Sequence, residues 1–349
     1  MTDQHTKGAR TARSWIIGAC AGVAAALAAS TALAQTAVRF SLDWRWEGPA
    51  APFAVALDKG YLKAEGLDVT IDPASGSREP ISRVASGTYD MGFGDVNSLI
   101  RFRDENPGTE MKAVMVVYDR PPFAIVGRKS RGITKEVSSL QGKKFGAPAA
   151  DAAFAQWPIF KAVNKIDDST MRLENVGFPV REPMLAQGEV DAVFGFSMSS
   201  YMNLKSRGVP ADDIVVLLMS DYGVELYGNT ILVSPKFAAE KPEAVKGFLR
   251  AFMKGVQDTV KDPASAVDGV IKRNDVAKKD VELERLKMVL DQNMITPAVK
   301  QNGFGGIDKA RFEKALDQIG LTFSYKNKPK VEDIFTDQYL PAAELRKIP

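Results

Sequence analysis

Two tryptophans, an arginine and a glutamate stand together in a polar segment near the start of the chain. Residues 44–47 read Trp-Arg-Trp-Glu. Trp44 ends a strand-like run at 38–44, and the other three residues follow it. An indole ring stacks on a flat ligand, and a carboxylate accepts hydrogen bonds from N–H donors or pairs with a cation. The segment therefore predicts a binding site for a flat small molecule.

Further polar and aromatic residues follow later strands, or lie in two segments that would join two halves of the molecule. In parallel α/β sheets, ligands sit beyond the carboxyl ends of the strands, where helix N-termini present N–H groups. We therefore expect these residues to line one cleft. Rings and carboxylates together favour an aminopyrimidine or another nitrogenous ring. The candidate binding residues are Trp44, Arg45, Trp46, Glu47, Ser75, Gly76, Ser77, Gly94, Asp95, Tyr118, Asp119, Asp151, Phe154, Phe196, Ser197, Tyr222 and Tyr227.

Some of these candidates have a second interpretation. Ser77 suits a helix cap as well as a ligand contact, and Asp151 would cap the helix that it opens. Trp157, on that same helix, would pack in the core. The loop at 75–77, together with Arg45 and Arg78, would hold an aromatic carboxylate or a sulfonate, which is the alternative class of ligand.

Three features of the first 34 residues are typical of a secretory signal peptide: a basic start, an apolar run at 15–28 and the cleavage pattern Ala-Leu-Ala at 32–34. The apolar run is too short to cross a bilayer, which needs about 20 apolar residues. Cys20 lies in a lipobox-like segment, but the apolar run continues beyond it, which argues against a lipid anchor. We expect export to the periplasm, with cleavage after Ala34.

The leader carries away the residues on which much catalysis depends. The chain has 1 His and 1 Cys, which are His5 and Cys20. Without them, the chain cannot form a Ser–His–Asp or Cys–His catalytic group. A zinc site built on His or Cys is excluded for the same reason. No closely spaced carboxylate motif indicates acid–base catalysis. We therefore expect neither an enzyme nor a cofactor or metal site.

After the leader, the composition is that of a nearly neutral protein without disulfides. Most of the 46 Lys and Arg and of the 43 Asp and Glu lie beyond residue 34, so the charges stay almost balanced. This balance argues against a nucleic-acid partner, for which a basic face is expected. No later apolar run is long enough to insert stably into a membrane.

Short apolar strands alternate with amphipathic helices along this part, which indicates an α/β fold with mainly parallel sheets. A helix at 52–64 and a core-facing helical stripe at 245–256 are the clearest helical patterns. Two prolines in the segment 119–122 suit a crossing between two lobes, and 221–229 would carry the chain back. The expected boundaries are 1–34 for the signal peptide, 35–122 and 226–349 for lobe I, and 123–225 for lobe II.

Several segments resemble the NMT1/THI5-like family of ABC-transporter solute-binding proteins, which is related to the sulfonate and taurine binders SsuA and TauA. The strongest is Leu42-Asp43-Trp44 followed by FAVALDKGYLKAEGLDV at 53–69, which is similar to the family's strand, ligand loop and helix-to-strand turn. Weaker similarities occur at 86–92, 139–144 and 185–192. Together these segments span nearly the whole chain after the leader.

The resemblance implies a type II periplasmic-binding-protein fold, in which two α/β lobes joined by two crossings close on a solute. It implies a monomer that presents the solute to an ABC permease and its ATPase, and a pyrimidine or thiamine-precursor-like ligand. Glu47 and Ala50 stand where pyrimidine-binding relatives have Asn and His, so a sulfonate or aromatic carboxylate stays open. A ligand sensor for a membrane kinase is a further alternative. A pyrimidine-synthesising enzyme is disfavoured, since those relatives draw on His and Cys.

Overall fold

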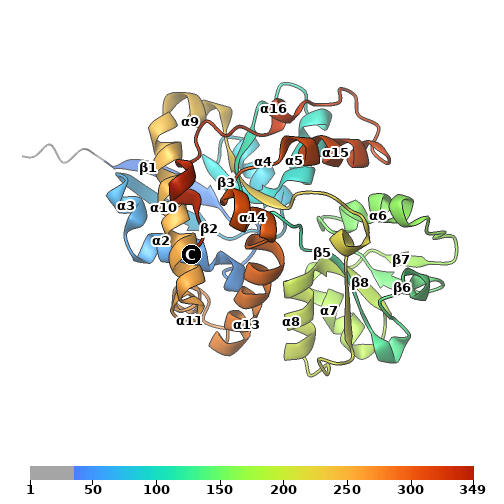
Figure 1. Ribbon diagram of the computed structural model, residues 1–349. Coiled ribbons are helices and arrows are strands. Elements are labelled where there is room, and N and C mark those ends of the chain that lie inside the picture. Colours follow the sequence, from blue (N-terminus) through green and yellow to red (C-terminus); the bar gives the residue numbers. More distant parts are fainter. Residues whose placement is uncertain (1–34) are drawn as a thin grey trace, which may run out of the picture. The chain divides into compact units, whose positions relative to one another are not determined.

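The computed structural model describes residues 35–349, so the predicted signal peptide, its cleavage site and Cys20 lie outside the described residues. The described part contains two five-stranded sheets with helices around them (Figure 1), which confirms the predicted α/β class. We call the parts around the two sheets the first and the second lobe. In spatial order, the first sheet comprises β2 (Leu67–Asp72), β1 (Thr36–Ser41), β3 (Met91–Asp95), β10 (Asn229–Val233) and β4 (Lys112–Val116). The second comprises β7 (Arg172–Glu174), β6 (Lys144–Gly146), β8 (Ala192–Phe196), β5 (Phe123–Arg128) and β9 (Ile214–Leu218).

The helices divide between the two lobes. The first lobe holds α2 (Ala51–Asp58), α3 (Tyr61–Ala64), α4 (Arg78–Ala85), α5 (Val96–Glu105), α9 (Pro235–Glu240), α10 (Pro242–Lys261), α11 (Pro263–Ala266), α12 (Asp268–Ile271), α13 (Lys279–Val289), α14 (Pro297–Asn302), α15 (Lys309–Gly320) and α16 (Val331–Ile334). The second holds α6 (Trp157–Asn164), α7 (Phe178–Gln187) and α8 (Ser197–Ser206).

Each sheet contains one strand that runs against its neighbours while the other four share one direction, so the sheets are mixed but mainly parallel, as expected. β10 pairs antiparallel with β3 and β4, and β5 pairs antiparallel with β8 and β9. Both strands come directly after the chain has crossed from the other sheet. A strand entered from the opposite lobe starts at the edge where the other strands end, and it therefore runs in the opposite direction.

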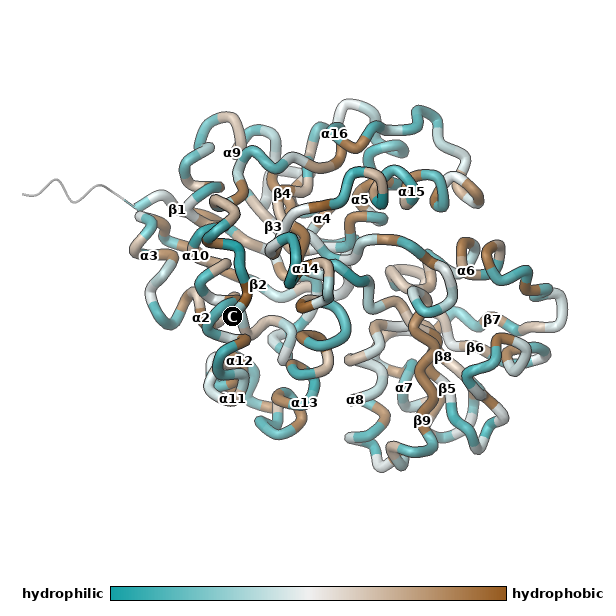
Figure 2. The backbone as a smooth tube through the Cα atoms, in the orientation of Figure 1, coloured by the Kyte–Doolittle hydropathy of each residue, from teal (hydrophilic) through white to brown (hydrophobic). Residues whose placement is uncertain are grey.

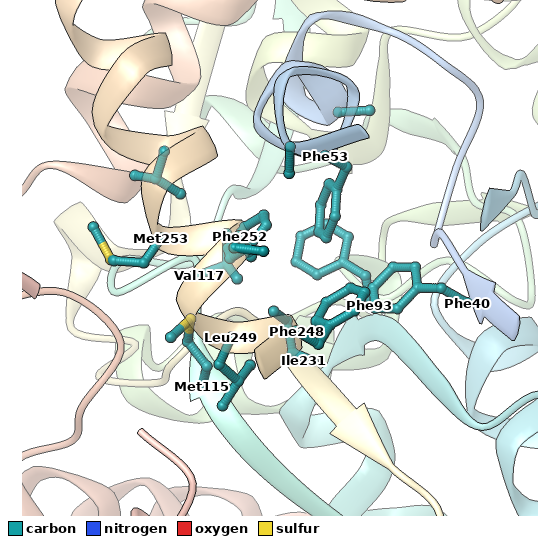
Figure 3. Packing of buried hydrophobic residues seen from close by; sticks show 14 of the residues in the cluster. Phe40, Phe53, Phe93, Met115, Val117, Ile231, Phe248, Leu249, Phe252 and Met253 are labelled. Carbon is teal, nitrogen blue, oxygen red and sulfur yellow. The ribbon is translucent and has the colours of Figure 1, made fainter. Parts of the chain in front are cut away.

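The core of the first lobe forms between β1, β3, α2 and α10 (Figure 3). The predicted stripe on α10 is confirmed, since Val245, Phe248 and Phe252 are all buried. Phe248 stacks on Phe40 with ring centroids 4.8 Å apart. Helices α2 and α10 approach closely at Gly255, where a Cβ atom would lie 2.3 Å from the Pro52 carbonyl oxygen. Glycine at this position therefore allows α10 to pack directly against the start of α2.

Strands β5, β8 and β9 of the second lobe are predominantly hydrophobic (Figure 2). The bounds of some elements differ from the sequence prediction. β1 ends at Ser41 rather than Trp44, and the predicted helix at 52–64 is divided at Gly60, whose φ of 70° no helix interior adopts. Among the described residues, no helix is both long and apolar enough to cross a membrane.

Candidate ligand-binding site

A cleft between the two lobes lies where the strands of both sheets end. Its unfilled space is about 670 Å³, part of which is open to solvent. Segments that follow β1, β2 and β4 form one wall, and segments that follow β6, β7 and β8 form the other. The lining residues are Leu42, Asp43, Trp44, Arg45, Glu47, Pro49, Ala50, Gly76, Ser77, Phe93, Tyr118, Asp151, Ala152, Phe178, Arg181, Phe196, Met198 and Ser199.

Asp43 is the carboxylate at the end of β1. Its Oδ2 accepts a hydrogen bond of 2.6 Å from the Asn229 side-chain amide, and its main-chain oxygen accepts one of 2.8 Å from the Gly76 N–H. Loss of hydration raises the pKa of Asp43 to about 7, and the amide of Asn229 only partly offsets this effect. Asp43 therefore changes charge close to neutral pH in the unliganded protein.

Aromatic rings from both lobes meet across the cleft. The Trp44 ring lies 5.2 Å from the Phe178 ring at an interplanar angle of 67°. Gly76 beside the Phe178 ring has a φ of 104°, a backbone conformation that residues with side chains rarely adopt, so glycine is favoured in this loop. Phe93 and Tyr118 make an edge-to-face pair deeper in the first lobe, with ring centroids 5.3 Å apart. The Arg45 guanidinium lies 5.4 Å from the Trp44 ring and the Arg181 guanidinium 5.5 Å from the Phe178 ring, so the faces open to a planar ligand are those that these groups leave free.

A buried group of charged residues forms the wall of the second lobe. The guanidinium of Arg181 donates to Asp151 Oδ2 over 2.7 Å and to Glu182 Oε1 over 2.6 Å, and its side chain is 4% exposed. The Ser200 hydroxyl also donates to Glu182. Burial raises the pKa of Asp151, although the charge of Arg181 opposes this shift. We name Asp151, Arg181 and Glu182 the second-lobe triad.

A similar group stands behind the wall of the first lobe. Arg285 Nη1 lies 3.1 Å from Glu47 Oε2, and Arg285 Nε donates to Glu282 Oε2 over 3.0 Å. Glu282 also accepts a hydrogen bond of 2.6 Å from the Gly48 N–H, which fixes the loop that presents Glu47. Burial raises the pKa of Glu47, and Arg285 opposes the shift. We name Glu47, Arg285 and Glu282 the first-lobe triad.

Two serines of the lining stand at helix starts. Ser77 precedes α4, is 2% exposed, and its hydroxyl has no hydrogen-bond partner among residues 35–349. Ser199 lies in the first turn of α8 on the opposite wall. Hydroxyls at helix N-termini suit an acceptor-rich group of a ligand, because the unpaired N–H groups of the first turn point the same way.

Eight of the seventeen candidate residues line this cleft. They are Trp44, Arg45, Glu47, Gly76, Ser77, Tyr118, Asp151 and Phe196.

Trp46, Asp95 and Asp119 lie elsewhere because each already has partners of its own. Trp46 points into the first-lobe core, where the Arg273 guanidinium lies 5.1 Å from its ring. Asp95 caps α5 by accepting from the N–H groups of residues 97 and 98. Asp119 pairs with Arg311 over 2.9 Å and anchors the first crossing.

The other six candidates also lie outside the cleft lining. Ser75 is exposed, and Gly94 is packed against the main chain before α4. Phe154 packs on Phe194 in the second-lobe core, and Ser197 is fully buried at the start of α8. The two tyrosines belong to the return crossing: Tyr222 donates to the Lys135 carbonyl, and Tyr227 accepts from the Asp308 N–H.

Sequence reasoning missed several residues of the lining. Asp43 lies shortly after the end of β1, and Phe178 and Arg181 lie in the first turn of the helix after β7. The rule that ligands sit beyond the carboxyl ends of the strands, here called the strand-end rule, therefore covers all three. The sequence pattern by itself indicates a helix only over residues 182–187, which leaves Phe178 and Arg181 in the loop before it. Glu282 and Arg285 carry no local signal, because their role depends on the packing of α13 beside the loop at 47–48. Within residues 35–349, no three His, Cys, Asp or Glu side chains group together to hold a metal ion.

Comparisons with known proteins match these observations. A family model described as NMT1/THI5 like matches residues 49–266. The riboflavin-binding protein RibY of Chloroflexus aurantiacus is 27% identical over 302 residues, which are 83% of this chain and 82% of that protein. The formylaminopyrimidine-binding protein of Halalkalibacterium halodurans is 28% identical over 309 residues, which are 86% of this chain and 89% of that protein.

The fold has solved counterparts. The periplasmic aliphatic sulphonate binding protein SsuA from Escherichia coli superposes with a TM-score of 0.66 at 13% identity, covering 88% of this chain and 94% of that one. This likeness confirms the predicted periplasmic-binding-protein fold. At such low identity it carries no information about the ligand.

Proposed function

The chain belongs to the NMT1/THI5-like family, and on this premise we propose that it is the periplasmic solute-binding component of an ABC importer. It captures a planar nitrogen heteroaromatic solute between lobe I (35–122 and 226–349) and lobe II (123–225). Closure of the lobes then presents the solute to a permease and its ATPase.

The chemistry of the cleft lining is the observation that carries this proposal. Trp44 and Phe178 offer ring faces from opposite lobes, and Asp43, Glu47 and Asp151 offer carboxylate oxygens around them. A planar ring satisfies the first set, and N–H groups on its edge satisfy the second. An aliphatic solute has no flat face that could stack on these rings.

The ligands named for two relatives support the same class. Riboflavin and formylaminopyrimidine both contain planar nitrogen heterocycles, and the proteins that bind them match more than four fifths of this chain. They differ greatly in size, so they support the ring chemistry rather than one particular molecule.

We propose binding without catalysis. The residues after the leader include no His and no Cys, whereas synthases of the family draw on both. Of the three acidic groups of the lining, Asp151 is engaged by Arg181 and Glu47 by Arg285, and Asp43 accepts a hydrogen bond from the Asn229 amide.

An organic anion is the second candidate ligand, and one observation favours it. The unpartnered Ser77 hydroxyl and Ser199 stand at helix starts on opposite walls, where a sulfonate or carboxylate would find donors. Against it, Arg181 already has two carboxylate partners. Its charge is therefore compensated before any anion arrives.

A thermal-shift screen followed by calorimetry tests the proposed function. The probes are riboflavin, 4-amino-5-hydroxymethyl-2-methylpyrimidine, benzenesulfonate and nitrate. We expect at least one heterocycle to raise the melting temperature and to bind without being altered, as chromatography of the recovered probe would show. Binding of benzenesulfonate or nitrate alone would contradict the proposal.

Stacking on Trp44 has its own test. Trp44→Ala should weaken the binding of the responding heterocycle by about tenfold or more, since the stacking of a base on an aromatic side chain contributes about 1–3 kcal/mol. Trp46→Phe is the matched control two residues away, because Trp46 faces the core and not the cleft. Equal affinity of Trp44→Ala and the wild type would rule out the stacking role.

Export is proposed from the leader alone. The protein recovered from the periplasm should begin at Gln35, which N-terminal sequencing would show. A chain that still begins at Met1, or that carries a lipid on Cys20, would contradict this prediction.

A further inference from the structure

The two triads share one composition, although they lie on opposite sides of the cleft. Each consists of a single guanidinium held between two carboxylates. In each, one carboxylate lines the cleft and the other stands behind the arginine: Asp151 and Glu182 in the second lobe, Glu47 and Glu282 in the first. When all these groups are ionised, each triad carries one surplus negative charge.

Asp43 adds a third acidic group without a cation beside it. Its hydrogen-bond partner is the neutral amide of Asn229. Glu47 and Asp95 are the acidic neighbours that act on it, and Tyr118 stands beside it as a neutral phenol. The lining thus places Asp43, Glu47 and Asp151 around one space.

The basic residues of the lining do not balance this charge. Arg181 is engaged by its two carboxylate partners. Arg45 is exposed at the rim, where its guanidinium lies 5.4 Å from the Trp44 ring and stays in contact with solvent. A charge in water is strongly screened, so Arg45 compensates the buried carboxylates only weakly.

Closing the cleft on a ligand removes water from these carboxylates. Surplus buried charge is costly unless a partner of opposite charge replaces the water or the carboxylate takes up a proton. Above pH 7, where Asp43 is ionised, a cationic ligand would supply the compensating charge. A guanidinium already lies over each of the two rings, Arg45 at 5.4 Å from Trp44 and Arg181 at 5.5 Å from Phe178, and the ring faces that these groups leave free also favour a cation, because the π face of a ring is negative. The loss of water from the carboxylates and the attraction of the ring faces both favour a positively charged ligand.

We infer that the captured solute is a cationic nitrogen heteroaromatic, whose positive charge compensates the surplus negative charge of the two triads and of Asp43. This inference rests on the proposed function and narrows it from planar nitrogen heterocycles to those that carry a positive charge. It disfavours sulfonates, carboxylates and nitrate as ligands of this cleft.

A matched series of probes tests the sign of the charge on one ring. The probes are 4-amino-2-methylpyrimidines with aminomethyl, hydroxymethyl or carboxylate at position 5, which are cationic, neutral and anionic at pH 8. We expect calorimetry to show affinity falling in that order, with about a tenfold loss or more from the cation to the anion. Equal affinity, or tighter binding of the carboxylate, would overturn the inference.

The outcomes separate this inference from the proposed function. If the hydroxymethyl compound or riboflavin binds as tightly as the aminomethyl compound, the inference fails and the capture of heterocycles stands. If only benzenesulfonate or nitrate binds, both fail.

A measurement on the unliganded protein keeps the inference testable if none of the probes binds. Glu47→Gln removes one surplus negative charge, so we expect an upward shift of the melting temperature of about 2 °C or more. Asp213→Asn is the control, and it should lower the melting temperature. Asp213 is paired with Arg128 over 2.7 Å and accepts hydrogen bonds from Ser130. A fall in melting temperature for Glu47→Gln like that for Asp213→Asn would overturn the inference.

Discussion

The two triads of the cleft are alike in composition, but the chain assembles them in different ways. The second-lobe triad comes from one stretch of chain, since Asp151 and Arg181 are separated by 30 positions. The first-lobe triad joins the loop at 47–48 to α13, and the hydrogen bond from Gly48 to Glu282 spans 234 positions. One triad thus belongs to the structure of a single lobe, whereas the other connects the loop at 47–48 to the distant helix α13.

The contacts of the two arginines differ accordingly. Arg181 makes short bonds of 2.6–2.8 Å to its carboxylates, all within the second lobe. The corresponding distances for Arg285 are 3.0–3.3 Å. Arg285 also donates to Asn203 on α8 of the second lobe over 3.3 Å. We infer that Arg181 mainly stabilises one lobe, whereas Arg285 contributes to the contact between the lobes.

The largest expected effect is on stability. Arg181→Met leaves two buried carboxylates without a cation, and it should lower the free energy of unfolding by about 3–5 kcal/mol. Arg285→Met should cost less, because its bonds are longer, and Arg45→Met should cost almost nothing, because Arg45 is exposed. Urea unfolding curves of the three variants measure this order. A larger loss for Arg285→Met than for Arg181→Met would refute the distinction.

A second expected effect concerns pH. Because the pKa of Asp43 rises from 3.8 to about 7 on folding, the folded chain holds a proton between these values that the unfolded chain has lost. The contribution of Asp43 to stability therefore falls as the pH rises from about 4 to about 7. Glu47 and Asp151 shift in the same direction. The difference in unfolding free energy between the wild type and Asp43→Asn should decline across this window, and a constant difference would contradict the raised pKa.

The smallest expected effect is at the outer contact between the lobes. Lys205 on α8 pairs with Glu284 on α13 over 2.6 Å, and both side chains are about 40% exposed. Exposed pairs contribute roughly 0–1 kcal/mol, and salt weakens them. Lys205→Ala should therefore weaken ligand binding by a few fold at low salt and leave the unliganded melting temperature unchanged. Lys246→Ala, which removes a pair within α10, should leave affinity unchanged.

The difference between the triads also explains which residues of the site could be predicted from the sequence. Strand periodicity and the strand-end rule locate Trp44, Ser77, Asp151 and Phe196, because these positions depend on local pattern. The same rule covers Asp43 and Arg181, once the start of α7 is placed at Phe178.

Non-local packing is invisible to that reasoning. Arg285 reaches the cleft wall only because α13 returns to the first loop, and β10 enters the first sheet only because the chain crosses back. Trp46 shows the reverse case: it looked like a ligand contact, but the turn at 48–50 directs it into the core.

Competitive capture from a mixture of solutes tests whether the cleft selects cationic heterocycles. The purified protein is incubated with an equimolar mixture of the three pyrimidines, riboflavin, benzenesulfonate and nitrate, then desalted and denatured. Mass spectrometry then quantifies what was retained. We expect heterocycles to dominate the retained fraction, with the cationic pyrimidine enriched over the anionic one. Retention of the sulfonate or nitrate in place of the heterocycles would contradict this expectation.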